Sequence, residues 1–333
     1  MLNFPVWPMS LEREPDQSRL SPRVIAGRLA LQGLSLGDAF GQQFFSPAVW
    51  HSWFYSKQLP LPVWSYTDDT VMALGLLEVL EEHERVEQDR LARVFAERFF
   101  AEPDRGYGNA TVRLLNQVER GGDWRVLSRA AFHGAGSFGN GAAMRVAPLG
   151  AFFADERDRL IDEARLSAEV THAHPEAIAG AIAVATAAAW ALQWRLAGRT
   201  EPASRLLAAA AEATPESATR EGILRACELP LDDSEHTAAD LLGNGLQVTA
   251  ADTVPFCLWC AAAHLDDYCE ALWAAVRVRG DIDTNCAIVG GIVALAVGDR
   301  GLPEEWLRRR ESYPHRRPPS EFRTEVRGPR EGR

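Results

Sequence analysis

The sequence predicts an all-α fold of one domain, and three observations support this. Apolar residues recur at helical spacing over many stretches, and 47 % of the 333 residues are hydrophobic, enough to bury a sizeable core. No β-branched alternating run bounded by turns is present, so strand signals are scarce. No internal repeat and no convincing linker divides the chain.

The expected helices follow one another along the whole chain. The first covers residues 24–40, and the second, at residues 71–80, is apolar nearly all round and should be buried. Further helices are expected at residues 91–100, 111–118, 175–196, 203–227, 236–250, 254–264, 268–277 and 285–297. Loops are expected at residues 46–66, 103–109 and 134–145, and the last of these is dense in glycine.

The two ends of the chain differ from its centre. Residues 1–20 contain early prolines and mixed charge, which predicts a loose lead-in. From residue 304 onward the chain turns to Arg, Pro and Glu, and we expect a disordered tail at residues 314–333. The folded domain is then expected at residues 21–313.

Composition excludes some partners. Asp and Glu number 46 against 35 Lys and Arg, a net charge of −11, whereas nucleic-acid binding needs a basic surface. The N-terminus lacks a signal-peptide pattern, and no apolar run is expected to reach the ~20 residues that span a membrane. Five cysteines, mostly in apolar stretches, fit buried thiols in a reducing compartment. We expect a cytoplasmic monomer.

A cluster of acids and hydroxyls opens the helix at residues 71–80. It reads Thr67-Asp68-Asp69-Thr70. Such residues are typical helix N-caps, and acids suit the positive end of the helix dipole. Capping needs only one or two of them, however, and two adjacent buried carboxylates repel each other unless a cation lies between them.

A second cluster, with Asp281, Asp283 and Thr284, precedes the helix at residues 285–297. If the two clusters meet in space, they offer four carboxylates together with threonine hydroxyls. Ligands that are all oxygen suit hard cations such as Mg²⁺, Mn²⁺ or Ca²⁺. Two metal ions would neutralise four carboxylates, bind and activate a water molecule, and hold substrate oxygens.

The glycine-dense loop contains Gly136-Ser-Phe-Gly-Asn-Gly-Ala142, which precedes Arg145. Backbone N–H groups of such a loop can form a concave nest for a phosphate or diphosphate. A plain turn between helices is the alternative. Arg145 is either a phosphate partner or a surface charge.

Two further groups stand beside these motifs. Thr171-His172-Ala-His174-Pro175 precedes the alanine-rich helix, and Pro175 suits the first helical turn. A histidine that faces substrate or caps the helix is favoured over a transition-metal ligand. Asp38, between small residues, either caps a helix or supports the metal site from outside the ligand set.

In this order the motifs resemble those of the ADP-ribosylglycohydrolase family, over roughly residues 24–298. The motifs are GDAFG (37–41), TDDT (67–70), DRGYG (104–108), GSFGNGAAMR (136–145), THAHP (171–175) and GDIDT (280–284). The resemblance implies a compact all-α fold with a binuclear Mg²⁺ or Mn²⁺ centre in a cleft. It also implies hydrolysis of the bond between ADP-ribose and an acceptor such as arginine, serine or an acetyl ester.

The resemblance also implies roles for individual residues. The metal ligands would be Thr67, Asp68, Asp69, Asp281, Asp283 and Thr284. The diphosphate and nearby ribose would lie on Gly136, Ser137, Phe138, Gly139, Asn140, Gly141 and Ala142, with His172 close to the phosphates. Many relatives carry glutamate where this chain has Phe45, a departure that bears on acceptor choice and metal affinity.

Motifs and resemblance lead to one mechanism. The metal ions would hold the ribose hydroxyls and polarise a water molecule, while Asp68 or Asp69 takes its proton as general base. Attack at the anomeric carbon would pass through an oxocarbenium-like state. The acceptor can be a protein side chain, a nucleobase or a small molecule. A non-catalytic ADP-ribose or nucleotide sensor is the alternative function.

Overall fold

The computed structural model describes residues 20–45 and 56–314. Three expected segments lie almost wholly or partly outside the described residues. Of the lead-in at 1–20 only residue 20 is described, of the loop at 46–66 only residues 56–66, and of the tail at 314–333 only residue 314.

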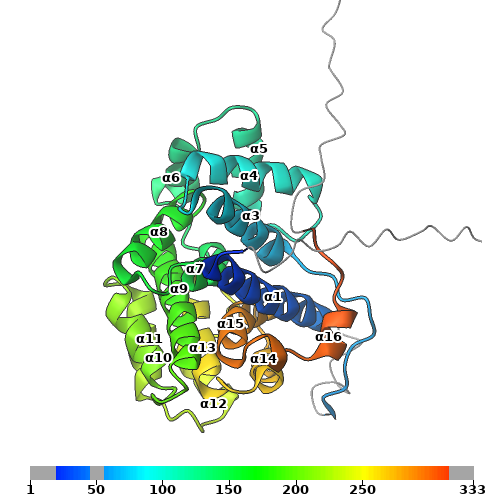
Figure 1. Ribbon diagram of the computed structural model, residues 1–333. Coiled ribbons are helices and arrows are strands. Elements are labelled where there is room, and N and C mark those ends of the chain that lie inside the picture. Colours follow the sequence, from blue (N-terminus) through cyan, green and yellow to red (C-terminus); the bar gives the residue numbers. More distant parts are fainter. Residues whose placement is uncertain (1–19, 46–55, 315–333) are drawn as a thin grey trace, which may run out of the picture.

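Within the described residues every regular element is a helix, and the only β pairing is two isolated bridges. The all-α expectation is therefore confirmed. The helices, shown in Figure 1, are α1 (Pro22–Gln42), η2 (Gln43–Phe45), α3 (Asp68–His83), α4 (Gln88–Ala101), α5 (Asn109–Glu119), α6 (Trp124–Gly134), η4 (Asn140–Ala142), α7 (Ala147–Phe152), α8 (Arg157–Glu169), α9 (Pro175–Leu196), α10 (Arg205–Ala213), α11 (Ala218–Glu228), α12 (Glu235–Leu242), α13 (Ala250–Ala263), α14 (Tyr268–Arg277), α15 (Ile282–Val297), η5 (Asp299–Gly301) and α16 (Glu304–Arg309).

Two expected helices are broken in the structure. The stretch at 203–227 forms α10 and α11, separated around Pro215, which has no N–H for a helical hydrogen bond. The stretch at 236–250 ends as helix at Leu242, because Gly243 and Gly245 adopt positive φ. Helices α6, α7, α8 and α16 are additional elements that the sequence analysis did not assign.

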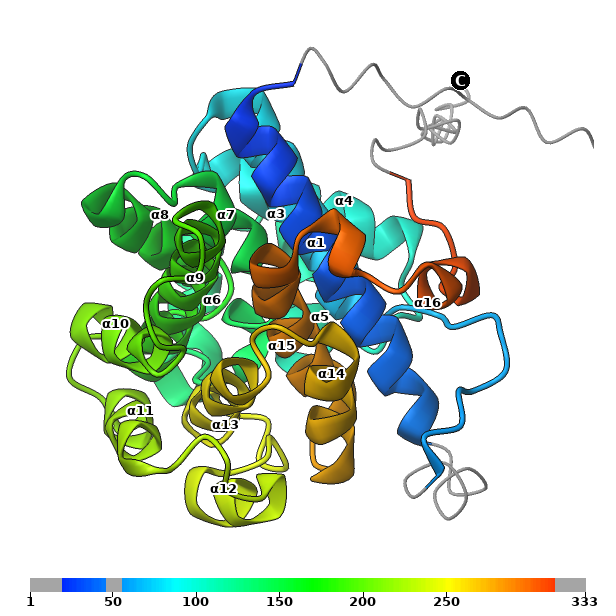
Figure 2. The same cartoon turned by 60° about the horizontal axis from the view of Figure 1, so that its bottom comes forward.

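Helix α9 corrects one expectation. By length and composition alone it could cross a membrane, so an apolar run of that size does exist. However, 78 % of its most apolar window is buried inside the fold, where α7, α8 and α10 pack around it (Figure 2). A buried core helix passes the same test, so the finding is weak evidence for a membrane span.

Helices α1 and α15 cross in close contact at the centre of the molecule, as Figures 1 and 2 both show. Glycines on α1 face α15 at intervals of four residues, so they lie on one side of the helix. A Cβ at Gly33 would lie 2.2 Å from the Ala294 Cβ, and one at Gly37 would lie 2.0 Å from the Cys286 carbonyl oxygen. The missing side chains let the two backbones touch.

This crossing positions the acidic residues. Asp38 follows Gly37 on α1 and is fully buried. Helix α3 also packs on α1, and its first turn reaches the same place. The first turn of α15 lies against the end of α1, where a Cβ at Gly41 would lie 2.8 Å from the Asp283 Cα. Three helices that are far apart in sequence thus bring acidic side chains to one point.

Candidate functional site

Asp38 caps the N-terminus of α3. Its carboxylate accepts hydrogen bonds from the Thr67 N–H (2.9 Å) and the Thr70 N–H (3.2 Å), and from the hydroxyl groups of both threonines. Thr67 is the N-cap residue itself, and its side chain accepts from the Asp69 N–H. These residues satisfy the end of the helix, so capping does not account for the carboxylates of Asp68 and Asp69.

Three of the carboxylates form a compact cluster. One oxygen from each of Asp38, Asp69 and Asp283 lies within 4.8 Å of the other two. Oδ1 of Asp69 and Oδ1 of Asp283 are buried and have no hydrogen-bond partner. No ion pair found among the described residues involves this cluster. The two acid-and-hydroxyl motifs therefore do meet in space, together with Asp38.

The Thr67 hydroxyl lies between two of these carboxylates. Its oxygen is 2.9 Å from Oδ1 of Asp38 and 2.9 Å from Oδ2 of Asp69. A hydroxyl has one proton, so it can donate to only one of them at a time. In the other contact, two oxygen atoms that both carry lone pairs face each other and repel. Only a further proton or a cation removes this repulsion.

The electrostatics lead to the same conclusion. Burial raises the pKa of Asp38 to about 6, and burial together with the charge of Asp38 raises the pKa of Asp68 to about 8. Burial and neighbouring aspartates raise the pKa values of Asp69 and Asp283 well above their ordinary range. The pKa of Asp281 is also raised, mainly because the side chain is buried. In this cluster ionised carboxylates need a counter-charge.

The donor set fits divalent cations. The available atoms are carboxylate oxygens and the hydroxyls of the buried residues Thr67 and Thr284, with no histidine or cysteine in the cluster. Asp68, Asp281 and Asp283 are partly exposed, so the cluster opens to solvent on one side. Hard cations that keep some water ligands prefer such surroundings.

The glycine loop is joined to the acidic cluster through Asn140. Its side-chain amide donates to Oδ2 of Asp281 (2.7 Å) and to the Thr253 hydroxyl (3.0 Å). The backbone of the loop is held by the segment before α13, where the Asn140 N–H donates to the Val248 carbonyl. The loop is therefore fixed relative to the acidic residues.

His172 packs directly against the same loop. A Cβ at Gly141 would lie 2.8 Å from both Cε1 and Nε2 of the imidazole, and one at Gly139 would lie 3.4 Å from Nε2. Gly136 has φ +78°, and a Cβ there would lie 2.7 Å from the His174 nitrogen. These glycines are required for the close approach. The THAHP segment and the glycine loop form one surface.

Two roles were expected for Arg145, a surface charge or a phosphate partner. The structure shows that it is neither exposed nor accessible to a phosphate. Its side chain is fully buried and lies over the ring of Phe95. Its guanidinium donates to the carbonyls of Gly141 (3.0 Å) and Ser167 (2.9 Å) and to the Thr171 hydroxyl (2.9 Å). It braces the glycine loop from the inside.

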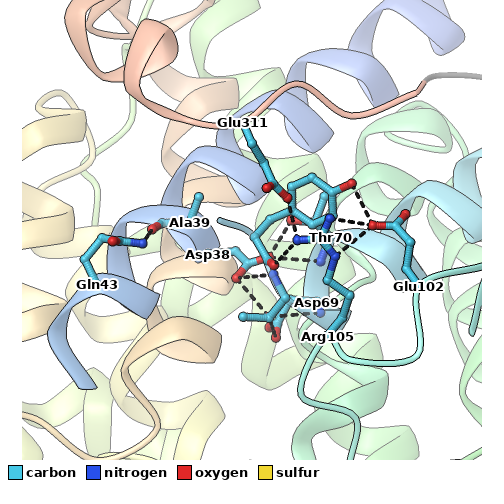
Figure 3. Close-up of polar contacts among 10 residues, drawn as sticks. Asp38, Ala39, Gln43, Asp69, Thr70, Glu102, Arg105 and Glu311 are labelled. Atoms are coloured by element: carbon cyan, nitrogen blue, oxygen red, sulfur yellow. Dashed lines mark hydrogen bonds and ion pairs between the residues drawn. The ribbon is translucent and has the colours of Figure 1, made fainter. Parts of the chain in front are cut away.

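The loop of the DRGYG motif covers Asp68. The Asp68 N–H donates to the Arg105 carbonyl (2.8 Å), and Gly106 lies beside the Asp68 carboxylate. Figure 3 shows the Arg105 guanidinium between Glu102 and Glu311, with which it forms ion pairs. The segment after α16 thereby holds the loop that carries one side of the acidic cluster.

A cavity of about 460 Å³ lies between α5 and α6, next to this surface. Thr171 and Phe132 line it, along with Arg113 and Gln117 of α5. The exposed Phe132 ring pairs with the Phe138 ring of the glycine loop, with 4.9 Å between their centroids. A cavity of this size suits a small-molecule ligand, and exposed aromatic faces can stack on a base.

The sequence predicted one wall of this cavity, the helix at 111–118 that is α5, but the wall formed by α6 was missed. Helix α6 was not assigned, and Phe132 has left-handed backbone angles inside it, which no periodicity reveals. The DRGYG motif immediately before α5 was the available signal, because a short glycine-containing motif often marks backbone that approaches a ligand.

Known proteins resemble this chain over most of its length. Residues 20–324 match the model of the ADP-ribosylglycohydrolase family. Human ADP-ribosylhydrolase ARH3 is 32 % identical in an alignment of 278 positions, which covers 74 % of this chain and 75 % of the relative. The ARH3 of Xenopus tropicalis is 30 % identical over 86 % of this chain and 91 % of its own length.

A solved structure shows the same fold. An "ADP-ribosylglycohydrolase-related protein complex" aligns with a TM-score of 0.62 and 28 % identity, and the match covers 88 % of this chain and 94 % of the other. The family resemblance drawn from the motifs agrees with the family match over most of the chain. The protein belongs to the ADP-ribosylglycohydrolase family.

Proposed function

We propose that the protein is a divalent-cation-dependent hydrolase that releases ADP-ribose from an acceptor by cleaving the glycosidic bond at the anomeric carbon. The observation that carries this proposal is the cluster of Asp38, Asp69 and Asp283, with its two unpartnered buried oxygens, next to the glycine loop. Family membership and the ARH3 relatives support the same reaction class.

Two cations, Mg²⁺ or Mn²⁺, are proposed to be held by Thr67, Asp68, Asp69, Asp281, Asp283 and Thr284. When bound, they would supply positive charge that orients ribose hydroxyls and makes a water molecule more acidic. Asp38 touches both threonines of the first motif, so it positions α3 and adds negative charge beside the ligands.

The substrate is proposed to lie along the surface from the acidic cluster to the α5–α6 cavity. The diphosphate would lie on the glycine loop beside His172. Burial and the charge of Arg145 lower the pKa of His172 to about 3, so the imidazole ring is neutral. The paired rings of Phe132 and Phe138 would stack on the base. The reacting ribose would then face the aspartates.

Of the two candidate general bases, Asp68 is the more exposed and lies beside the loop at Gly106, whereas Asp69 is buried. We therefore assign Asp68 to take the proton of the attacking water. As the bond to the acceptor breaks, positive charge develops on the ribose ring, and the remaining carboxylates stabilise it.

The acceptor is the open part of this proposal. Phe45, at the position where many relatives have glutamate, is 44 % exposed on η2. A neutral aromatic side chain there cannot contribute a metal ligand, so binding of the cations depends on the aspartates and threonines. Arginine, serine, an acetyl ester, a nucleobase or a small molecule are the candidate acceptors.

The test is release of free ADP-ribose from a panel of substrates: ADP-ribosyl-arginine, ADP-ribosyl-serine, O-acetyl-ADP-ribose and ADP-ribosylated nucleic acid. Each is incubated with Mg²⁺, with Mn²⁺ and with a chelator. Cation-dependent release from one of them is expected and identifies the acceptor class. ADP-ribose binding without any release would favour the non-catalytic sensor.

A further inference from the structure

Arg145, Thr171 and His172 form a continuous buried chain of hydrogen bonds behind the glycine loop. The Arg145 guanidinium lies 2.9 Å from the Thr171 hydroxyl oxygen. That oxygen lies 2.7 Å from Nδ1 of His172. The exposed fractions of Arg145, Thr171 and His172 are 0 %, 3 % and 6 %, so the three side chains are largely shielded from bulk solvent.

The direction of each hydrogen bond in this series follows from which of its atoms carry protons. An arginine side chain has donors only, so the Thr171 oxygen accepts from Arg145. The single proton of the hydroxyl then needs an acceptor, because a buried donor that makes no hydrogen bond destabilises the folded state. Nδ1 of His172 is the one acceptor that the described residues offer to it.

This order selects one tautomer of the neutral imidazole. If Nδ1 accepts the threonine proton, the ring proton resides on Nε2. The Cε1–Nε2 edge of the ring faces the glycine loop, because a Cβ at Gly141 would lie 2.8 Å from each of these atoms. No hydrogen bond from Nε2 to a described residue is found, so its N–H is available to a ligand on the loop.

Arg145 also holds the other side of the same surface. A second nitrogen of its guanidinium donates to the Gly141 carbonyl (3.0 Å). One buried side chain therefore fixes both the imidazole and the loop backbone that it faces. A planar guanidinium with several donors in fixed directions suits this double role better than a lysine ammonium.

We propose that Arg145 and Thr171 are positioning residues that fix His172 as its Nε2–H tautomer and aim this N–H at an anionic oxygen of ADP-ribose on the glycine loop. The second half of this proposal rests on the proposed function, whereas the first half concerns the free protein alone. Thr171 acts through His172 and does not itself touch the ligand oxygen.

The tautomer is tested in the full chain without ligand, by two-bond ¹H–¹⁵N correlation spectra of the histidine rings. His172→Asn identifies the signals by their loss. The wild type is expected to show a protonated Nε2 and an unprotonated Nδ1. Thr171→Val is expected to move the ring toward the Nδ1–H form, while Thr171→Ser, which keeps the hydroxyl, retains the original form.

The consequence for the ligand is tested by titration calorimetry with ADP-ribose. Thr171→Val is expected to weaken binding about 5- to 10-fold, as for the loss of one oriented hydrogen bond. Thr171→Ser is expected to stay within about twofold of the wild type. Thr171→Ala, which removes the hydroxyl without adding a second methyl group, repeats the test if the valine variant folds poorly.

The outcomes separate the two claims. An Nδ1–H tautomer in the wild type, or an unchanged ring in Thr171→Val, overturns the positioning role whatever the activity. A changed tautomer with unchanged ADP-ribose affinity overturns the step from His172 to the ligand. If the wild type binds no ADP-ribose at all, the proposed function itself fails, independently of the tautomer.

Discussion

At the scale of single residues, Asp38 and Asp69 have different tasks although both belong to the acidic cluster. Asp38 accepts four hydrogen bonds from Thr67 and Thr70 and holds the end of α3. One oxygen of Asp69 lies 2.9 Å from the Thr67 hydroxyl oxygen, and its other oxygen is buried without a partner. One carboxylate serves the fold, and the other is left for a cation.

This contrast predicts the effect of Asp69→Asn. The metal-free variant is expected to be at least as stable as the wild type, because a buried charge next to other carboxylates is removed. Release of ADP-ribose is expected to fall at least about 10²-fold, because a carboxylate that would hold the cation is lost. Thermal unfolding in chelator and single-substrate kinetics measure the two effects.

Asp266→Asn, at an exposed acid between α13 and α14, is the matched control and should change neither quantity. An Asp69→Asn enzyme with normal rate and normal dependence on the cation would remove Asp69 from the site.

At the scale of elements, the glycine contact between α1 and α15 places Asp38 next to Asp283. Side chains on this face of α1 would force the helices apart, since even a single Cβ at Gly37 would meet a backbone carbonyl at 2.0 Å. The site therefore depends on residues that carry no chemistry of their own.

We expect Gly37→Ala to destabilise the protein by roughly 3 kcal/mol or more, since overpacking against backbone is hard to relieve. Gly108→Ala, where an added Cβ meets nothing within 4 Å, should cost less than about 1 kcal/mol. Urea unfolding of the two variants gives the comparison. A Gly37→Ala protein as stable as the wild type would contradict the close contact.

The segment after α16 acts on the site through Arg105. Glu311 forms an ion pair with Arg105, and the Arg105 carbonyl accepts the Asp68 N–H. Both side chains of this ion pair are less than a quarter exposed, so solvent screens it only in part.

Glu311→Gln is expected to weaken Mn²⁺ binding about 2- to 10-fold, because the loop over Asp68 becomes less well held. Glu304→Gln, which breaks a well-exposed ion pair with Arg308 on α16, serves as the control and should leave Mn²⁺ binding unchanged. Calorimetry measures both affinities. If Glu311→Gln binds Mn²⁺ as tightly as Glu304→Gln does, the segment after α16 does not support the acidic cluster.

At the scale of the whole molecule, the acidic cluster links stability to pH. The folded pKa values of Asp38 and Asp68, about 6 and about 8, lie above the ordinary aspartate value of 3.8. Between the ordinary pKa of 3.8 and the raised values of about 6 and about 8, the folded state therefore binds more protons than the unfolded state. The free energy of unfolding falls as pH rises through this range.

In chelator, the melting temperature is thus expected to decrease from about pH 5 to pH 8. Mg²⁺ or Mn²⁺ should restore it, and most strongly at pH 8, where fewer protons compete with the cation for the carboxylates and the cation binds the folded state alone. Scanning calorimetry at each pH measures this. A cation effect that is equal at pH 5 and pH 8 would argue against a carboxylate site.

Much of the fold could be predicted from sequence because helical periodicity is local. The ends of α9 and α14 agree with their expected ranges, since Pro175 starts one and the apolar pattern stops cleanly in the other. The break at Pro215 was missed although a proline is itself a local signal that ends a helix. The kink at Phe132 was missed because left-handed backbone angles leave no trace in the periodicity.

The sequence by itself determined the helical class, the two acid-and-hydroxyl motifs at the starts of α3 and α15, and the glycine loop, because each is encoded within a few adjacent residues. Only the tertiary structure decided that Asp38 joins Asp69 and Asp283, that Arg145 is buried beneath the glycine loop, and that α5 and α6 enclose a cavity. These facts depend on contacts between segments tens to hundreds of residues apart. The packing of α1 on α15 brings Asp38 to Asp283, contacts among other helices create the rest, and no local pattern in the chain encodes them.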